Sequence, residues 1–173
     1  AVAHLKLGMQ LAALDLPVEE RDQWAYDFGT DERLGVYLTN TLEQALGRYR
    51  LLLGSFISDE ANEAAKVKRD FPVMVVIGNP PYSVSSQNKS QYIENLMETY
   101  KAAVRDERNI QPLSDDYIKF IRFAHDRIER TGYGIIGMIT NHTYLSGLIH
   151  RGMREEFVKS FSQIYVLNLH GTK

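Results

Sequence analysis

One tetrapeptide, Asn79-Pro80-Pro81-Tyr82, combines residue types that can hold a flat polar group. Neither proline has a backbone N–H and each fixes φ at about −65°, so the pair stiffens the chain and cannot continue a strand. The Asn79 side chain and the proline carbonyls offer hydrogen-bond acceptors, and Tyr82 offers a ring face. These groups match a planar –NH2 group, whose two hydrogens need two acceptors and whose π system needs a stacking partner.

The apolar run immediately before the tetrapeptide predicts a buried strand over residues 73–78. Open α/β sheets bind their ligands just beyond the carboxyl ends of strands, which is where the tetrapeptide lies. The sequence therefore predicts a ligand site at the tetrapeptide.

The rest of the sequence alternates predicted helices and strands. Apolar spacing and capping residues predict helices over residues 1–16, 41–53, 59–68 (with Ser58 as N-cap), 91–105, 115–130 (capped by Ser114-Asp115-Asp116, ended by Gly132) and 148–160. Further strands are predicted over residues 33–39, 133–140 and 163–169, while residues 18–32 read as irregular. The segment 83–113 is predicted to be a long insertion. Arg122, Arg127 and Arg130 are predicted to lie on the solvated face of their helix. This order predicts an α/β fold with a doubly wound sheet.

Composition narrows the class of protein. With 173 residues, 44% of them hydrophobic, the chain has room for one α/β domain, which we expect to span residues 1–173 without a second domain. No apolar run approaches the roughly 20 residues of a membrane span, so we expect no membrane contact and a cytoplasmic location. The chain has no cysteine, and its scattered histidines predict no metal site. Its net charge of −2 is unusual for a domain that holds DNA by itself.

The tetrapeptide resembles the signature loop of S-adenosyl-L-methionine (SAM)-dependent amino-methyltransferases, in the form typical of adenine-N6 DNA methyltransferases. Three other stretches extend the resemblance: Ala-Val-Ala-His-Leu-Lys-Leu-Gly (1–8), Tyr-Leu-Thr-Asn-Thr-Leu-Glu (37–43) and Leu-Asn-Leu-His-Gly (167–171). Together they are similar to the methyltransferase region of type ISP single-polypeptide restriction–modification enzymes. The resemblance implies a Rossmann-like methyltransferase fold, SAM as cofactor and methylation of the exocyclic N6 of adenine in double-stranded DNA.

The resemblance assigns a catalytic role to Asn79, Pro80, Pro81 and Tyr82. The target adenine leaves the duplex, because its amino group is out of reach in the base stack. Asn79 Oδ1 and the Pro80 carbonyl accept the two amino hydrogens, and Tyr82 stacks on the ring. Transfer then depends on positioning and electrostatics, with no metal required.

The resemblance also assigns cofactor-binding roles to Asn40, Thr41 and Phe120. Asn40 matches the residue that ends a strand and accepts from the cofactor's adenine amino group, although the family more often has Asp there. The other interpretation of Asn40 is a turn or N-cap residue. Phe120, in Asp116-Tyr117-Ile118-Lys119-Phe120, matches an aromatic residue that packs on the cofactor's adenine; at helical spacing it also fits a plain core position.

Several parts of the family pattern are not found in this sequence. The glycine-rich cofactor loop and the acidic residue that holds the ribose are absent, and the family's late base-stacking aromatic would follow residue 173. We therefore expect an incomplete methyltransferase fold, the middle part without the first strands and the last hairpin, inactive alone and prone to self-association. DNA would be bound through missing segments and a target-recognition domain.

Two other functions remain open. A protein glutamine-N5 methyltransferase uses the same loop, because a side-chain amide is another planar nitrogen; the long 83–113 insertion and the type ISP-like flanks argue against it. A non-catalytic DNA-binding remnant of a restriction system is favoured, for this chain alone, by the missing glycine-rich loop.

Overall fold

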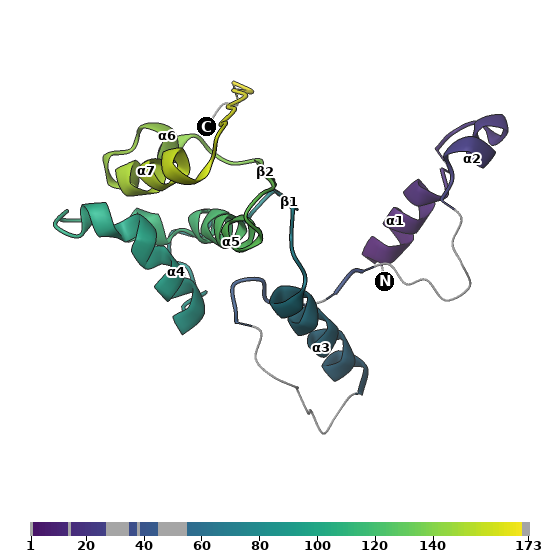
Figure 1. Ribbon diagram of the computed structural model, residues 1–173, viewed down its shortest axis with the longest axis horizontal. Coiled ribbons are helices and arrows are strands. Elements are labelled where there is room, and N and C mark those ends of the chain that lie inside the picture. Colours follow the sequence, from purple (N-terminus) through teal and green to yellow (C-terminus); the bar gives the residue numbers. More distant parts are fainter. Residues whose placement is uncertain (1, 14, 27–34, 38, 45–54, 171–173) are drawn as a thin grey trace. The chain divides into compact units, whose positions relative to one another are not determined.

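The structure, a computed structural model, describes residues 2–13, 15–26, 35–37, 39–44 and 55–170 (Figure 1). The described residues divide into two compact units. The first comprises those up to Thr39 and those from 55 to Ala64, and the second comprises 40–44 and the residues from Ala65 onward. All seven residues to which the sequence assigns a site role belong to the second unit.

The first unit contains α1 (Val2–Leu11) and α2 (Val18–Trp24). Helix α1 is shorter than the predicted 1–16, because the chain turns at Ala13, whose φ of 52° is left-handed. Helix α2 lies where the sequence predicted irregular chain, and Glu19 and Glu20 in its first turn suit the positive end of the helix dipole. The amide of Tyr26 donates to the carbonyl of Leu11 at 2.7 Å and brings the ends of the two helices together.

Helix α3 (Ser55–Asp70) runs from the first unit into the second. It begins before the predicted start, so the predicted N-cap at Ser58 is wrong. Of the predicted strand 33–39, the described residues 35–37 and 39 belong to no strand. Of the predicted helix 41–53, residues 41–44 form a turn instead, and the rest lies outside the described residues.

The sheet of the second unit consists of two parallel strands, β1 (Val75–Gly78) and β2 (Ile135–Met138). Val75 pairs with Ile135 and Gly78 with Met138, which confirms the predicted strands at 73–78 and 133–140 with shorter bounds. The predicted burial of the first strand is wrong on one face, where Val75 and Ile77 are 55% and 81% exposed. Helix α5 (Asp116–Thr131) lies between them in sequence and packs against β2 (Figure 1). The predicted strand at 163–169 is wrong: these residues form no ladder, and Tyr165 and Leu167 are 84% and 83% exposed.

Shorter elements complete the second unit. Helix α4 (Gln91–Lys101) continues into the 3-10 turn η1 (Ala102–Val104), which confirms the predicted helix at 91–105. A second 3-10 turn, η2 (Gln111–Ser114), precedes α5. After β2 come α6 (Thr143–Ser146), the 3-10 turn η3 (Leu148–His150) and α7 (Arg151–Ser160), so the predicted helix at 148–160 begins as a 3-10 turn.

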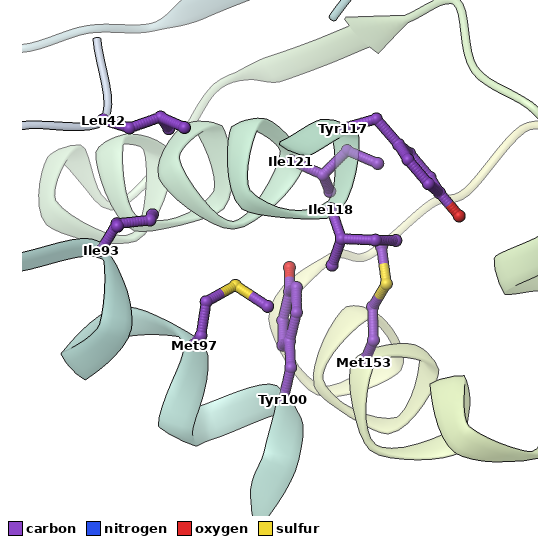
Figure 2. Close-up of a cluster of buried hydrophobic side chains, with 8 residues drawn as sticks. All are labelled: Leu42, Ile93, Met97, Tyr100, Tyr117, Ile118, Ile121 and Met153. Atoms are coloured by element: carbon purple, nitrogen blue, oxygen red, sulfur yellow. The ribbon is translucent and has the colours of Figure 1, made fainter. Parts of the chain in front are cut away.

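The core lies between α4, α5 and α7, and α4 packs on both of the other helices (Figure 2). Its buried side chains are Leu42, Ile93, Met97, Tyr100, Tyr117, Ile118, Ile121 and Met153. Full burial of one such side chain stabilises the fold by about 1.5–3 kcal/mol. Met138 of β2 packs against this cluster, so the inner face of the sheet and the helices share one core.

Two arginines of α5 are buried, so the predicted solvated face is wrong for them. Arg127 donates to the carbonyls of Lys68 and Phe71, and Arg122 donates to the carbonyl of Leu96 at 3.1 Å. Guanidinium groups can be buried when fixed acceptors replace water. The sequence shows only their helical spacing and gives no sign of these backbone partners.

Helix α5 ends at Gly132, whose φ of 87° is left-handed, as the sequence predicted. Two residues later Gly134 has a φ of 153°, and a Cβ atom there would collide with the carbonyl of Met74. That carbonyl accepts from the amide of Ile135 at 2.8 Å, at the start of the β1–β2 ladder. Glycine at 134 therefore allows the two strands to begin pairing.

We expect Gly134→Ala to lower the free energy of unfolding by about 2–3 kcal/mol, since the new methyl group must displace the backbone of Met74. Urea unfolding followed by circular dichroism measures this loss. The matched control is Gly137→Ala in β2, where an added Cβ meets Ile77 Cγ1 at 3.9 Å, an ordinary contact. Equal losses from the two changes would show that close approach at Gly134 is unimportant.

Among the described helices, none combines the length and the apolar character that crossing a membrane requires.

Candidate functional site

The tetrapeptide begins at the carboxyl end of β1, directly after Gly78, whose carbonyl accepts from the amide of Ile139 at 3.0 Å. Pro80 is buried, whereas Asn79 and Pro81 are exposed. Tyr82 is 50% exposed. The buried proline anchors the turn, and the Asn79 amide and part of the Tyr82 ring remain accessible to a ligand.

The chain leaves the tetrapeptide through Ser83, which is held at both backbone groups by the N-terminus of α5. The Ser83 amide donates to Asp115 Oδ1 at 2.8 Å, and the Asp116 amide donates to the Ser83 carbonyl at 3.2 Å. Asp115 is also the N-cap of α5, because the same oxygen accepts from the amide of Tyr117 at 3.4 Å. One carboxylate thus joins the start of α5 to the residue that follows Tyr82.

A second set of polar groups holds the chain further along, near α4. Asp116 Oδ1 accepts from Ser86 Oγ at 2.6 Å and from Asn88 Nδ2 at 3.0 Å. The Lys119 ammonium, on a side chain that is 1% exposed, donates to the carbonyl of Asn88, to Ser86 Oγ and to Glu94 Oε1. The sequence predicted Asp115 and Asp116 as helix-capping residues and did not predict this network, which depends on contacts between distant parts of the chain.

Aromatic rings continue from the tetrapeptide into the core. The Tyr82 and Tyr117 ring centroids are 5.3 Å apart with planes at 46°, and those of Tyr117 and Tyr144 are 6.4 Å apart at 52°. Burial, helped by the Asp115 carboxylate and the nearby Tyr144, raises the pKa of the Tyr117 hydroxyl despite its hydrogen bond to Asn141. Tyr117 is therefore neutral near pH 7 and acts as an apolar ring with one polar end.

The predicted cofactor residue Asn40 lies in a turn, as its second interpretation had it. Asn40 Oδ1 accepts from the amide of Leu42 at 3.1 Å, and its Nδ2 donates to Glu43 Oε1 at 3.0 Å and to Asn88 Oδ1 at 3.4 Å. Since Asn88 also binds Asp116, Asn40 is linked to the same end of α5 as Ser83. Thr41 beside it is half-buried.

Phe120 lies on α5, one turn beyond Asp116, and is half-buried against the core cluster. The structure thus connects the tetrapeptide and Asn40 to the first turn of α5 by hydrogen bonds, and Phe120 follows on the same helix. It shows no contact of Phe120 with Asn40 among the interactions of the described residues.

A pocket of about 470 Å³ lies beside the chain that follows the tetrapeptide, lined by residues 84–87, Glu94 and Lys119 among others. None of the seven predicted site residues lines it. The described residues contain no cluster of three or more His, Asp or Glu side chains placed to hold a metal ion.

The family model of the Eco57I restriction-modification methylase matches residues 23–173, and the chain belongs to this family. This confirms the predicted resemblance to restriction–modification methyltransferases. No curated protein matches the chain.

Three solved structures that contain DNA or a DNA mimic resemble the chain. It is 27% identical to the ATP-dependent Type ISP restriction-modification enzyme LlaBIII bound to DNA, with a TM-score of 0.59 over 73% of this chain and 9% of that one. The Type ISP enzyme LlaGI, solved as a nuclease-deletion mutant with a DNA substrate mimic, is 23% identical, with a TM-score of 0.53 over 61% of this chain and 11% of that one. The DrdV–DNA complex is 30% identical, with a TM-score of 0.51 over the same shares, 61% and 11%. The chain therefore spans about a tenth of each neighbour's length.

The Glu94 carboxylate supports the network through Lys119. Burial by itself would raise the pKa of the Glu94 carboxyl, but hydrogen bonds from Lys119 and Lys101 outweigh it and hold that pKa below the usual 4.5. A carboxyl whose pKa is lower in the folded chain contributes stability above pH 4.5 and loses that contribution as the pH falls.

Glu94→Gln should lower the free energy of unfolding at pH 7 by about 1–2 kcal/mol, because buried Lys119 loses its anionic partner.

Urea unfolding between pH 3 and pH 8 measures this difference, which should become smaller as the pH falls and Glu94 takes up a proton. The control is Glu98→Gln, which breaks an ion pair with Arg105 in which both side chains are more than half exposed. Exposed pairs contribute about 0–1 kcal/mol, so we expect a small change. A Glu94→Gln effect that persists unchanged at pH 3 would contradict the assigned role of the charge.

Proposed function

We propose that the chain is the middle part of an incomplete Rossmann-like methyltransferase domain that acts on DNA within a restriction–modification enzyme. Its substrate would be the exocyclic N6 of adenine, and its methyl donor SAM. The observation that carries the proposal is the accessible Asn-Pro-Pro-Tyr turn at the carboxyl end of β1, in a chain that belongs to a restriction-modification methylase family.

The residues of the turn suit this chemistry in their types, and Asn79 and Tyr82 suit it in their exposure as well. Asn79 Oδ1 and the Pro80 carbonyl would accept the two amino hydrogens of an adenine flipped from the duplex, and Tyr82 would cover one face of its ring. Accepting both hydrogens favours a pyramidal nitrogen, whose lone pair would form the new N–C bond as the methyl–sulfur bond of SAM breaks. The surplus amino proton would then pass to water. The protein thus contributes positioning and electrostatics.

SAM supplies a methyl group bonded to a positively charged sulfur. Asn40, which is linked through Asn88 to the first turn of α5, fits its adenine in part, because Asn40 is exposed and its Oδ1 has a second lone pair beside the one used by Leu42. Thr41 would lie beside that contact, and the Phe120 ring would pack on the adenine. No metal enters the proposal.

Double-stranded DNA is the proposed partner, supported by the DNA complexes of LlaBIII and DrdV. Since this chain has a net charge of −2, most contacts with the phosphates would come from other segments and a target-recognition domain. The proposed place of action is the cytoplasm.

Asn79→Ala, tested in the complete restriction–modification enzyme that carries this segment, should reduce transfer of labelled methyl groups from SAM to duplex DNA by about 100-fold or more. Removal of one preorganised polar group that stabilises a transition state costs about that much. Affinity for SAM, measured by calorimetry, should change less than about twofold, because Asn79 contacts the base.

The matched control is Asn109→Ala, at an exposed position whose side chain caps a local turn through the amide of Gln111. It should leave transfer unchanged. Transfer retained in Asn79→Ala would refute the assignment, and transfer to a glutamine-containing peptide in place of DNA would support the protein methyltransferase instead.

A further inference from the structure

The Tyr82 ring has one side toward the protein and one toward solvent. Its neighbour on the protein side is Tyr117, at 5.3 Å between centroids and 46° between planes, and Tyr82 is nevertheless 50% exposed. Tyr117 is 2% exposed and belongs to the core cluster that Figure 2 shows. A half-exposed ring therefore contacts a buried one.

The backbones of the two tyrosines are coupled as well. Asp115 Oδ1 accepts from the amide of Ser83, next to Tyr82, and from the amide of Tyr117. The Asp116 amide holds the Ser83 carbonyl. The Cα atoms that carry the two rings are thus placed relative to each other by the N-cap of α5, which leaves the side-chain torsions of Tyr82 as the remaining freedom.

The support for Tyr117 continues into α6 and α7. Its ring contacts that of Tyr144 at 6.4 Å, and Tyr144 contacts Phe157 of α7 in an edge-to-face arrangement at 6.3 Å. Arg154 of α7 donates to the carbonyls of Tyr144 and Gly147, at 2.8 Å each. The first of these three rings belongs to α5 and the last to α7. Both helices pack in the core, so Tyr117 has little freedom to move away from Tyr82.

We propose that Tyr117 is a positioning residue, whose buried ring holds the Tyr82 ring in the orientation that stacks on the substrate base. The inference rests on the proposed function, in which Tyr82 covers the flipped base. If the Tyr82 ring had to be ordered at each turnover, the enzyme would spend part of its time with the ring in unproductive rotamers, and kcat would be lower. A ring already held in place avoids this loss. Tyr117 touches no reacting atom; it acts through Tyr82.

The first test observes the ring directly and needs no substrate. 3-Fluorotyrosine is placed at position 82 alone, and ¹⁹F NMR of the complete enzyme is recorded with Tyr117, Tyr117→Leu and Tyr117→Phe. We expect Tyr117→Leu to shift the resonance toward that of a free tyrosine and to narrow it, because the ring current and the restraint of the neighbour are lost. Tyr117→Phe, which keeps the ring, should retain the original shift and width.

The second test measures methyl transfer to duplex DNA. Tyr117→Leu should lower kcat about tenfold with the KM for SAM unchanged, and Tyr117→Phe should restore kcat to within about twofold. The matched control is Tyr92→Leu, the same change on α4, where the Tyr92 hydroxyl donates to Asp126 Oδ2 at 3.3 Å; it should alter stability without altering the fluorine resonance. Tyr117→Met, which fills the space without a ring, replaces Tyr117→Leu if the latter fails to fold.

A fluorine resonance that is the same with Tyr117 and Tyr117→Leu or Tyr117→Met overturns the inference. So does a changed resonance with unchanged kcat, or a Tyr117→Phe variant as impaired as Tyr117→Leu. If the unaltered enzyme transfers no methyl group to DNA, the proposed function fails separately, while the fluorine spectra still decide whether Tyr117 holds Tyr82.

Discussion

The Asp115 carboxylate at the start of α5 is the contact on which the arrangement of the site depends. It accepts from Ser83, beside the tetrapeptide, and from Tyr117, in the first turn of the helix. Both bonds place a negative charge at the positive end of a 16-residue helix, where it is stabilised. Without this group, two backbone donors would lose their acceptor at a nearly buried position, and the exit from the rigid proline turn would no longer be fixed.

Helix α5 also holds the chain at the start of strand β1, through contacts near its own C-terminus. Near its C-terminus, Arg127 donates to the carbonyls of Lys68 and Phe71, and Thr131 donates to the carbonyl of Val73 at 3.0 Å. The segments before and after β1 are therefore both bound to one helix. This explains how a sheet of two short strands can present the turn after Gly78 in a defined place.

The two faces of this sheet differ in their surroundings. Met138 on the inner face packs with the core, whereas Ile77 and Ile135 on the outer face are 81% and 66% exposed. Parallel strands are usually covered on both faces, and both strands read as continuous apolar runs in the sequence. The site is therefore supported from the α5 side, and its geometry depends on that helix more than on the sheet.

Local signals in the sequence determined much of the second unit. The apolar runs gave β1 and β2, Asp115 and Gly132 gave the two ends of α5, and the Asn-Pro-Pro-Tyr letters gave the family and the candidate loop. These succeed because capping, proline geometry and the extended conformation of apolar β-branched runs depend on near neighbours in the chain. Predictions that needed a distant partner were wrong or incomplete: residues 163–169 have strand composition and no paired strand, and Arg122 and Arg127 are buried on distant carbonyls.

Only the tertiary structure decided that Ser83, Asn88 and Lys119 meet at one helix end and that Tyr82 rests on Tyr117. Such contacts join residues about 30 or more positions apart, which no local spacing encodes.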